Sequence, residues 1–193
     1  MKKCVASIAL ISAMFLQTAA LTGCTEYYNA NEVTRDNMVF ITSDAGNKAF
    51  VWKYIWDGDI VDTYIEIPDE IDGFNVVRLG GFTGIGVPHP FEITTEDEPY
   101  FKGADPEKYD VPVTFDDLVF TVEIGENITD LTIPPYYVGV KQPDGSIIFY
   151  DVHLVFIVDE DNSKFYAEDG ILYNRKDDSV VEGISYGNRR AED

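Results

Sequence analysis

Apolar and polar residues alternate along most of the chain with a period of two, which is typical of strands with one buried face. Alternating segments predict strands at 38–42, 49–55, 60–67, 118–124, 136–140, 146–150 and 152–158. The first two flank a turn-rich stretch and predict a hairpin, and the turn at 142–145 predicts a second one. Few windows have the period of a helix, so the sequence predicts a mainly β fold.

Three segments, at 65–80, 122–131 and 156–165, resemble one another. Each opens with two apolar residues two positions apart, the pattern of a short strand with one apolar face. A unit this short cannot bury that face alone, so neighbouring units must stack. We therefore expect the three strands to form one layer and to bury the residues that match between them, which are Ile67, Ile124 and Val158, separated by 57 and 34 residues.

These segments resemble the BspA-like leucine-rich-repeat family of bacterial surface proteins. Positions that fit the family's repeat are Ile67-Pro68, Ile71, Gly73, Val76, Leu79 and Gly80. Its closing pattern is matched by Val158-Asp159, Asn162, Phe165 and Asp169-Gly170-Ile171-Leu172-Tyr173. The matches cover roughly 60–82, 118–133 and 152–175. The sequence departs from the family at its Ala-Phe position, where Gly81-Phe82 follows Gly80 directly. It also departs in the second unit, where Gly125 replaces the proline.

The resemblance implies a short leucine-rich-repeat-like β solenoid, here preceded by a β-hairpin region, and a surface adhesion or ligand-binding role. A β-sandwich of independent hairpins fits the same alternation and is the alternative. The domain spans 38–187, with an irregular insertion at 86–117 and a frayed tail at 188–193. We expect the insertion to carry ligand contacts, because it holds five prolines and nine acidic residues as well as several aromatic residues.

The first 24 residues resemble the signal of a bacterial lipoprotein. Lys2 and Lys3 precede an uncharged apolar run, and Leu21-Thr22-Gly23-Cys24 resembles a lipobox. The resemblance implies removal of 1–23, lipidation of Cys24 and a flexible lipidated tether over 24–37. It places the mature domain outside the cytoplasm, in the cell envelope, held to the membrane by its lipid. An uncleaved anchor helix and an ordinary secretory signal are the alternatives.

Composition and charge exclude several functions. The chain has 35 acidic and 14 basic residues, a net charge of -21, and such a chain repels nucleic acid. Two cysteines and two histidines exclude a disulfide scaffold and a Cys/His zinc site. The acidic stretch 159–163 fails as a calcium loop, because Lys164 stands where glycine is required. Neither His89 nor His153 has a nucleophile nearby in sequence, so no catalytic residue, metal or cofactor is expected.

Two aromatic groups are the candidate ligand contacts. In the insertion these are Tyr100, Phe101 and Tyr109, which either contact a ligand or pin the loop onto the domain. On the strand at 49–55 and just after it, the group comprises Trp52, Tyr54 and Trp56. Because these three lie two positions apart they share one face, which is either core or a platform for sugar rings or peptide.

The sequence therefore predicts a lipid-anchored bacterial cell-surface binding or adhesion module without catalytic activity. Its partners would be the membrane, through the N-terminal lipid, and an extracellular glycan or protein. The alternative is a lipoprotein enzyme, or an accessory subunit, that acts on surface polysaccharide or peptide. A histidine beside a buried carboxylate in a cleft would favour the enzyme, whereas a shallow sheet with an aromatic face would favour binding.

Overall fold

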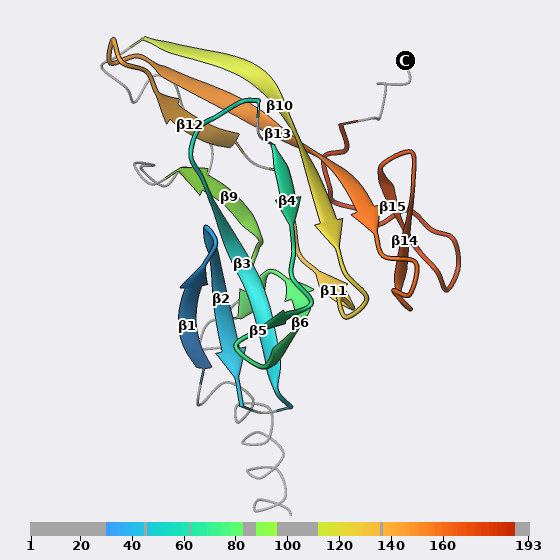
Figure 1. The fold of residues 1–193 in the computed structure, drawn as a ribbon. Helices are drawn as coiled ribbons and strands as arrows, with labels where there is room; N and C mark the ends of the chain where they lie inside the picture. The colour runs from blue at the N-terminus through green and yellow to red at the C-terminus, as the bar shows by residue number, and fades with distance from the viewer. Residues whose placement is uncertain are drawn as a thin grey trace, which may run out of the picture.

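The computed structural model of the chain describes residues 30–44, 46–61, 63–82, 88–95, 112–135 and 137–187. These residues form strands and turns and contain no helix, which confirms the mainly β prediction (Figure 1). Within this part of the chain, nothing helical has the length and apolar character needed to cross a membrane.

The first sheet has seven strands in the order β1-β2-β3-β6-β11, with β5 beside β6 and β9 beside β3. Its strands are β1 (Ala30–Arg35), β2 (Met38–Ser43), β3 (Lys48–Trp56), β5 (Glu70–Ile71), β6 (Phe74–Leu79), β9 (Glu92–Thr95) and β11 (Asp130–Leu131). Strands β2 and β3 are the predicted first hairpin. Strands β3, β6 and β11 run parallel to one another.

The prediction of a flexible tether over 24–37 is wrong for its second half. Residues 30–35 form β1, which pairs with the whole length of β2. Asp36 and Asn37 both have positive φ, at 47° and 63°, so the two strands join through a tight hairpin turn. The polar side chains of β1 are tolerated because it is the edge strand of the sheet. Residues 24–29 lie outside the described part.

The second sheet has four strands in the order β12-β13-β10-β4. They are β4 (Tyr64–Glu66), β10 (Val113–Ile124), β12 (Tyr137–Lys141) and β13 (Ile147–Val158). Strands β12 and β13 form the second predicted hairpin, around the turn at 142–145. Figure 1 shows the two long strands, β10 and β13, side by side; they run parallel and pair over their full length.

The opening strands of the three repeated segments lie in this second sheet with the spacing that the sequence predicts. Val122 pairs with Ile65, 57 residues earlier, and Ile124 pairs with Val158, 34 residues later. Ile67 and Ile124 are buried, as expected, but Val158 is only partly buried because it ends β13 and exposed turn residues follow it. Independent hairpins pair antiparallel, so the parallel pairing does not support the sandwich alternative.

The chain passes repeatedly from the second sheet to the first, from β4 to β6 and again from β10 to β11. The even-numbered residues in the second half of β10 point into the core between the sheets; they are Leu118, Phe120, Val122 and Ile124. From β13, Val152, Leu154 and Phe156 join them, and from the first sheet Phe40, Val51 and Leu79. One contiguous apolar core therefore holds the two sheets together.

The segment 86–117 is not wholly an irregular insertion. Its described parts include β8 (Pro88–His89), which pairs with β7 (Gly81–Phe82), and β9, which runs parallel to β3. Phe91 and Ile93 are buried, and Val113 begins β10. Both ends of the segment therefore belong to the fold, because their apolar side chains complete the core. Residues 96–111 lie outside the described part.

The last described residues cover the outer edge of β13. After it come β14 (Phe165–Glu168) and β15 (Ile171–Asn174), an antiparallel hairpin. Beyond the hairpin, the backbone N–H of Leu154 donates to Ser185 O at 2.7 Å, and that of Gly187 donates to Leu154 O at 3.0 Å. Backbone groups of β13 that would otherwise face water are thereby paired, which protects the edge from other chains.

Candidate functional site

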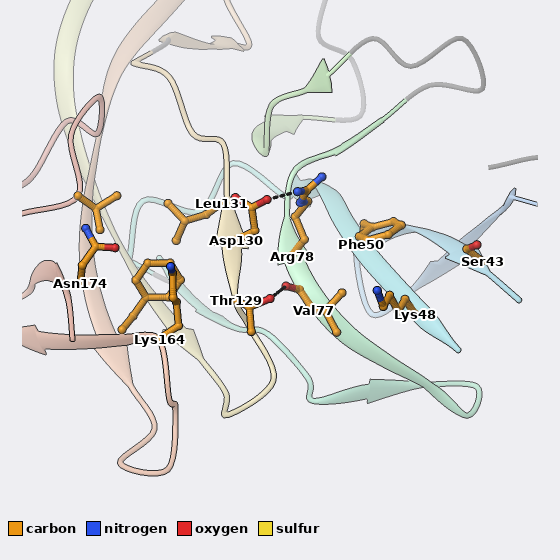
Figure 2. A pocket seen from close by; sticks show the side chains of 12 residues that line it. Ser43, Lys48, Phe50, Val77, Arg78, Thr129, Asp130, Leu131, Lys164 and Asn174 are labelled. Atoms are coloured by element: carbon orange, nitrogen blue, oxygen red, sulfur yellow. Dashed lines mark hydrogen bonds and ion pairs between the residues drawn. The ribbon is translucent and has the colours of Figure 1, made fainter. Parts of the chain in front are cut away.

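A groove of about 600 Å³ crosses one side of the molecule, where β3, β6 and β11 meet the terminal hairpin. Its lining residues are Ser43, Lys48, Phe50, Val77, Arg78, Thr129, Asp130, Leu131, Lys164, Phe165, Asn174 and Val181. Figure 2 shows Lys48 and Phe50 on one side, Lys164 and Asn174 on the other, and Arg78 and Asp130 between them. Segments from four parts of the chain thus form one surface.

Three of the lining residues, Lys48, Arg78 and Lys164, are cationic, although acidic residues outnumber basic ones in this chain 35 to 14. Both lysines are exposed. The guanidinium of Arg78 pairs with Asp130, its partner across the β6–β11 ladder, and lies 5.8 Å from the centroid of the Phe50 ring. Asp130 therefore neutralises Arg78, and the lysines supply the net positive charge of the groove.

Polar and apolar groups are mixed in the groove. Ser43, Thr129 and Asn174 bring hydroxyl and amide groups, while Leu131 and Val181 bring apolar surface. This mixture suits a ligand that combines anionic groups with hydroxyl groups and apolar faces.

The second notable surface is the outer face of the four-stranded sheet, formed by the odd-numbered residues of β10 and β13. The side chain of His153 contacts three polar groups there. Its Nδ1 lies 2.7 Å from the hydroxyl of Ser185, and its Nε2 lies 3.6 Å from Asp117 Oδ1 and 3.9 Å from Asp151 Oδ2. The side chain of His153 is 24% exposed, so it is partly shielded from solvent by these neighbours.

A serine, a histidine and a carboxylate are the components of a nucleophilic dyad or triad. In such a site the carboxylate is buried, where it holds the imidazole firmly. Asp117 is instead 80% exposed, so water screens its charge. The contact at 3.6 Å is also longer than a hydrogen bond. The cluster therefore lacks the buried, hydrogen-bonded carboxylate that a hydrolytic triad needs.

Aromatic and aliphatic side chains also gather on the outer face. The exposed ones are Tyr64, Phe115, Val119, Tyr137 and Ile157, which come from all four strands. The Phe115 ring stacks on Phe149 at 5.8 Å and meets Tyr137 edge-on at 5.9 Å. Phe115 and Tyr137 therefore form a small exposed aromatic patch at one end of this sheet, while Tyr64, Val119 and Ile157 lie farther along the strands. Neither residue of the patch was a candidate from sequence.

Of the two alternatives for the aromatic residues of β3, core or platform, the structure supports core at Trp56. Trp56 is 1% exposed and packs edge-on against the rings of Phe120 and Tyr150, so it belongs to the core. Trp52 and Tyr54 are partly buried, and Tyr54 packs against the core cluster. Alternation predicts a shared face but does not say whether that face is covered, and the second sheet covers it at Trp56.

The other predicted site residues lie outside the described part of the chain. They are Cys24, Tyr100, Phe101 and Tyr109. Lipidation of the first and ligand contact by the other three stay predictions. For His89 the structure describes the backbone only, as part of β8.

Sequence reasoning missed the acidic neighbours of His153, although two signals were available. Asp151 lies two residues before His153 on a strand, so both side chains share a face. Asp117 lies 34 residues before Asp151, the same spacing that pairs Ile124 with Val158. Extending the repeat register beyond the apolar positions places the two carboxylates opposite each other.

Comparison with models of known protein families, with curated proteins and with solved structures finds no match to this chain.

Proposed function

We propose that the chain is a lipid-anchored bacterial cell-surface binding module of the BspA-like leucine-rich-repeat family, without catalytic activity, and that its groove binds an anionic glycan. The repeat register supports the family proposal, because strands 57 and 34 residues apart pair in parallel, as stacked units do. The passage of the chain from one sheet to the other supports a short solenoid. The lipobox-like sequence ending at Cys24 supports the anchor.

One observation carries the ligand proposal: Lys48 and Lys164 converge on one groove in a chain of net charge -21. The lining has a net positive charge, because Asp130 offsets only Arg78, and such a cleft concentrates anions that the acidic surface elsewhere repels. The hydroxyl and amide groups beside the lysines suit the hydroxyl groups of a sugar. We therefore infer a glycan that carries carboxylate or sulfate groups.

The experiment measures binding of the purified full chain to an immobilised acidic polysaccharide and to a neutral one of the same backbone. We expect binding to the acidic polymer, weakening as salt rises, because exposed charges are screened. Lys48→Gln and Lys164→Gln should each weaken binding by up to about fivefold, because an exposed ion pair contributes up to about 1 kcal/mol.

Lys141→Gln is the matched control, because Lys141 is an exposed lysine at the end of β12 that does not line the groove. It should bind like the unchanged chain. Equal binding to the two polymers, or equal weakening by all three substitutions, would contradict the proposal. Binding to an acidic peptide instead of the polysaccharide would retain the groove and reject the glycan.

A further inference from the structure

A polar cluster lies on the outer face of the second sheet, apart from the groove and independent of the function proposed for the groove. Asp117 lies on β10, and Asp151 and His153 lie on β13. One ligand atom of each residue, two carboxylate oxygens and the imidazole Nε2, lies within 4.8 Å of the other two. Three groups that bind metals thus meet at one point.

The two strands hold these groups in fixed positions. Strands β10 and β13 pair over twelve residues, and Asp117 and Asp151 are direct partners in that register. Two like charges opposite each other on neighbouring strands destabilise a sheet. A cation between the carboxylates removes this repulsion, and His153 lies on the same face of β13, two residues from Asp151.

The imidazole is already oriented for a ligand role. The hydroxyl of Ser185 lies 2.7 Å from Nδ1, which leaves Nε2 directed at the two carboxylates. Metal-binding histidines usually have a hydrogen-bond partner on the second ring nitrogen, and here the Ser185 hydroxyl holds the orientation of the ring. Ser185 comes from the segment that covers the edge of β13, so the partner is supplied by a different part of the chain.

The distances suit a small tetrahedral ion. With bonds of about 2.1 Å to nitrogen and oxygen, two ligands of a tetrahedral zinc ion lie about 3.4 Å apart. Nε2 lies 3.6 Å and 3.9 Å from the two carboxylate oxygens, and these oxygens lie within 4.8 Å of each other, so rotation of the aspartate side chains would bring the three atoms to that spacing. An imidazole with two carboxylates favours zinc over calcium, because calcium takes oxygen ligands.

We propose that Asp117, Asp151 and His153 form a binding site for a divalent transition-metal ion, with Zn²⁺ as the best fit and a fourth position open to water or to a group from a bound partner. The ion would neutralise the paired carboxylates and tie β10 to β13 on the face that also carries the exposed aromatic patch.

The test is calorimetric titration of the purified full chain with Zn²⁺ alone, beside the same titration with Ca²⁺. We expect one Zn²⁺ per chain at this site, tighter binding of Zn²⁺ than of Ca²⁺, and a rise in melting temperature when Zn²⁺ is present.

His153→Gln should weaken this binding at least tenfold, and Ser185→Ala about tenfold to a hundredfold, the range for partners of a metal-binding histidine. The thiols of Cys4 and Cys24 can also bind Zn²⁺. Binding at the proposed site is therefore measured as the difference between the unchanged chain and His153→Gln.

Two variants on β10 provide a matched comparison. Asp117→Asn and Glu123→Gln each remove one negative charge from the same face of the same strand, six residues apart. Only Asp117→Asn should weaken Zn²⁺ binding at least tenfold. Asp117 is exposed, so this variant should fold, and circular dichroism checks that it does.

Equal Zn²⁺ affinity for Asp117→Asn and Glu123→Gln would overturn the proposal, as would unchanged affinity in His153→Gln. Tighter binding of Ca²⁺ than of Zn²⁺ would do the same, since it would mark a general acidic surface. In each of these cases the cluster would be an ion pair between His153 and its carboxylates.

Discussion

Replacing Asn162 by alanine should destabilise the fold more than its size suggests. Asn162 is 1% exposed and lies in the turn after β13. Its Nδ2 donates to Gly125 O at 2.7 Å and to Ile128 O at 3.0 Å. Its Oδ1 accepts from the backbone N–H groups of Lys164 at 2.9 Å and Phe165 at 2.8 Å. One amide therefore joins the turn after β13 to the turn after β10, with both donors and both acceptor positions in use.

The size of the effect follows from the groups that lose their partners. Two of the four hydrogen bonds, to Ile128 O and from the Phe165 N–H, are buried. A buried polar group left without a partner costs about 1–3 kcal/mol. The other two groups are partly exposed and can turn to water at a smaller cost. We expect Asn162→Ala to lower the free energy of unfolding by about 3–5 kcal/mol, a large share of the roughly 5–15 kcal/mol typical of a domain.

The assay is urea unfolding of the full chain, followed by the fluorescence of Trp52 and Trp56 and extrapolated linearly to water. Asn75→Ala is the matched control, because Asn75 is an exposed asparagine on β6. It should change the free energy of unfolding by about 0.5 kcal/mol or less. Asn162→Asp should be as severe as the alanine variant, because the carboxylate cannot donate to either carbonyl. A loss below about 1 kcal/mol for Asn162→Ala would refute this account.

Three further outcomes are expected. Phe120→Ala should lower the free energy of unfolding by about 3–5 kcal/mol in the same urea assay, since Phe120 is 0% exposed, and a cost near zero would contradict the core described above. Cys24→Ala should abolish incorporation of radiolabelled fatty acid, and equal labelling of both forms would reject the anchor. Hydrogen bonds from Ser146 lower the pKa of Asp144 below its ordinary value of 3.8, so Ser146→Ala should raise that pKa in an NMR titration. Because the folded-state pKa is depressed, the stability from this contact is present above pH 3.8 and is lost as the pH falls through the lower folded-state value, and the two forms should converge in stability there.

The local sequence determined the strands whose side chains alternate and the turns between them. Strands β2, β3 and β13 and the second half of β10 lie where the period of two predicts them, because burial on one face selects apolar residues at every second position. The repeat spacing also determined the parallel register of three strands, since equivalent apolar positions must stack to be buried. By contrast, β1 is polar and has no such signal, and its pairing depends on β2.

Tertiary structure alone decided which faces are covered and which distant residues meet. Alternation places Trp56 on one face of β3, but the second sheet decides that this face is core. Lys48, Arg78 and Lys164 have no common spacing, and they share a groove only because the strands and the terminal hairpin pack side by side. The periodicity of the local sequence determines where strands form. A site assembled from separate segments depends instead on how complete sheets pack against each other. That packing is a property of the whole core. For this reason, the pattern of no single segment predicted either the groove or the polar cluster on the outer face of the second sheet.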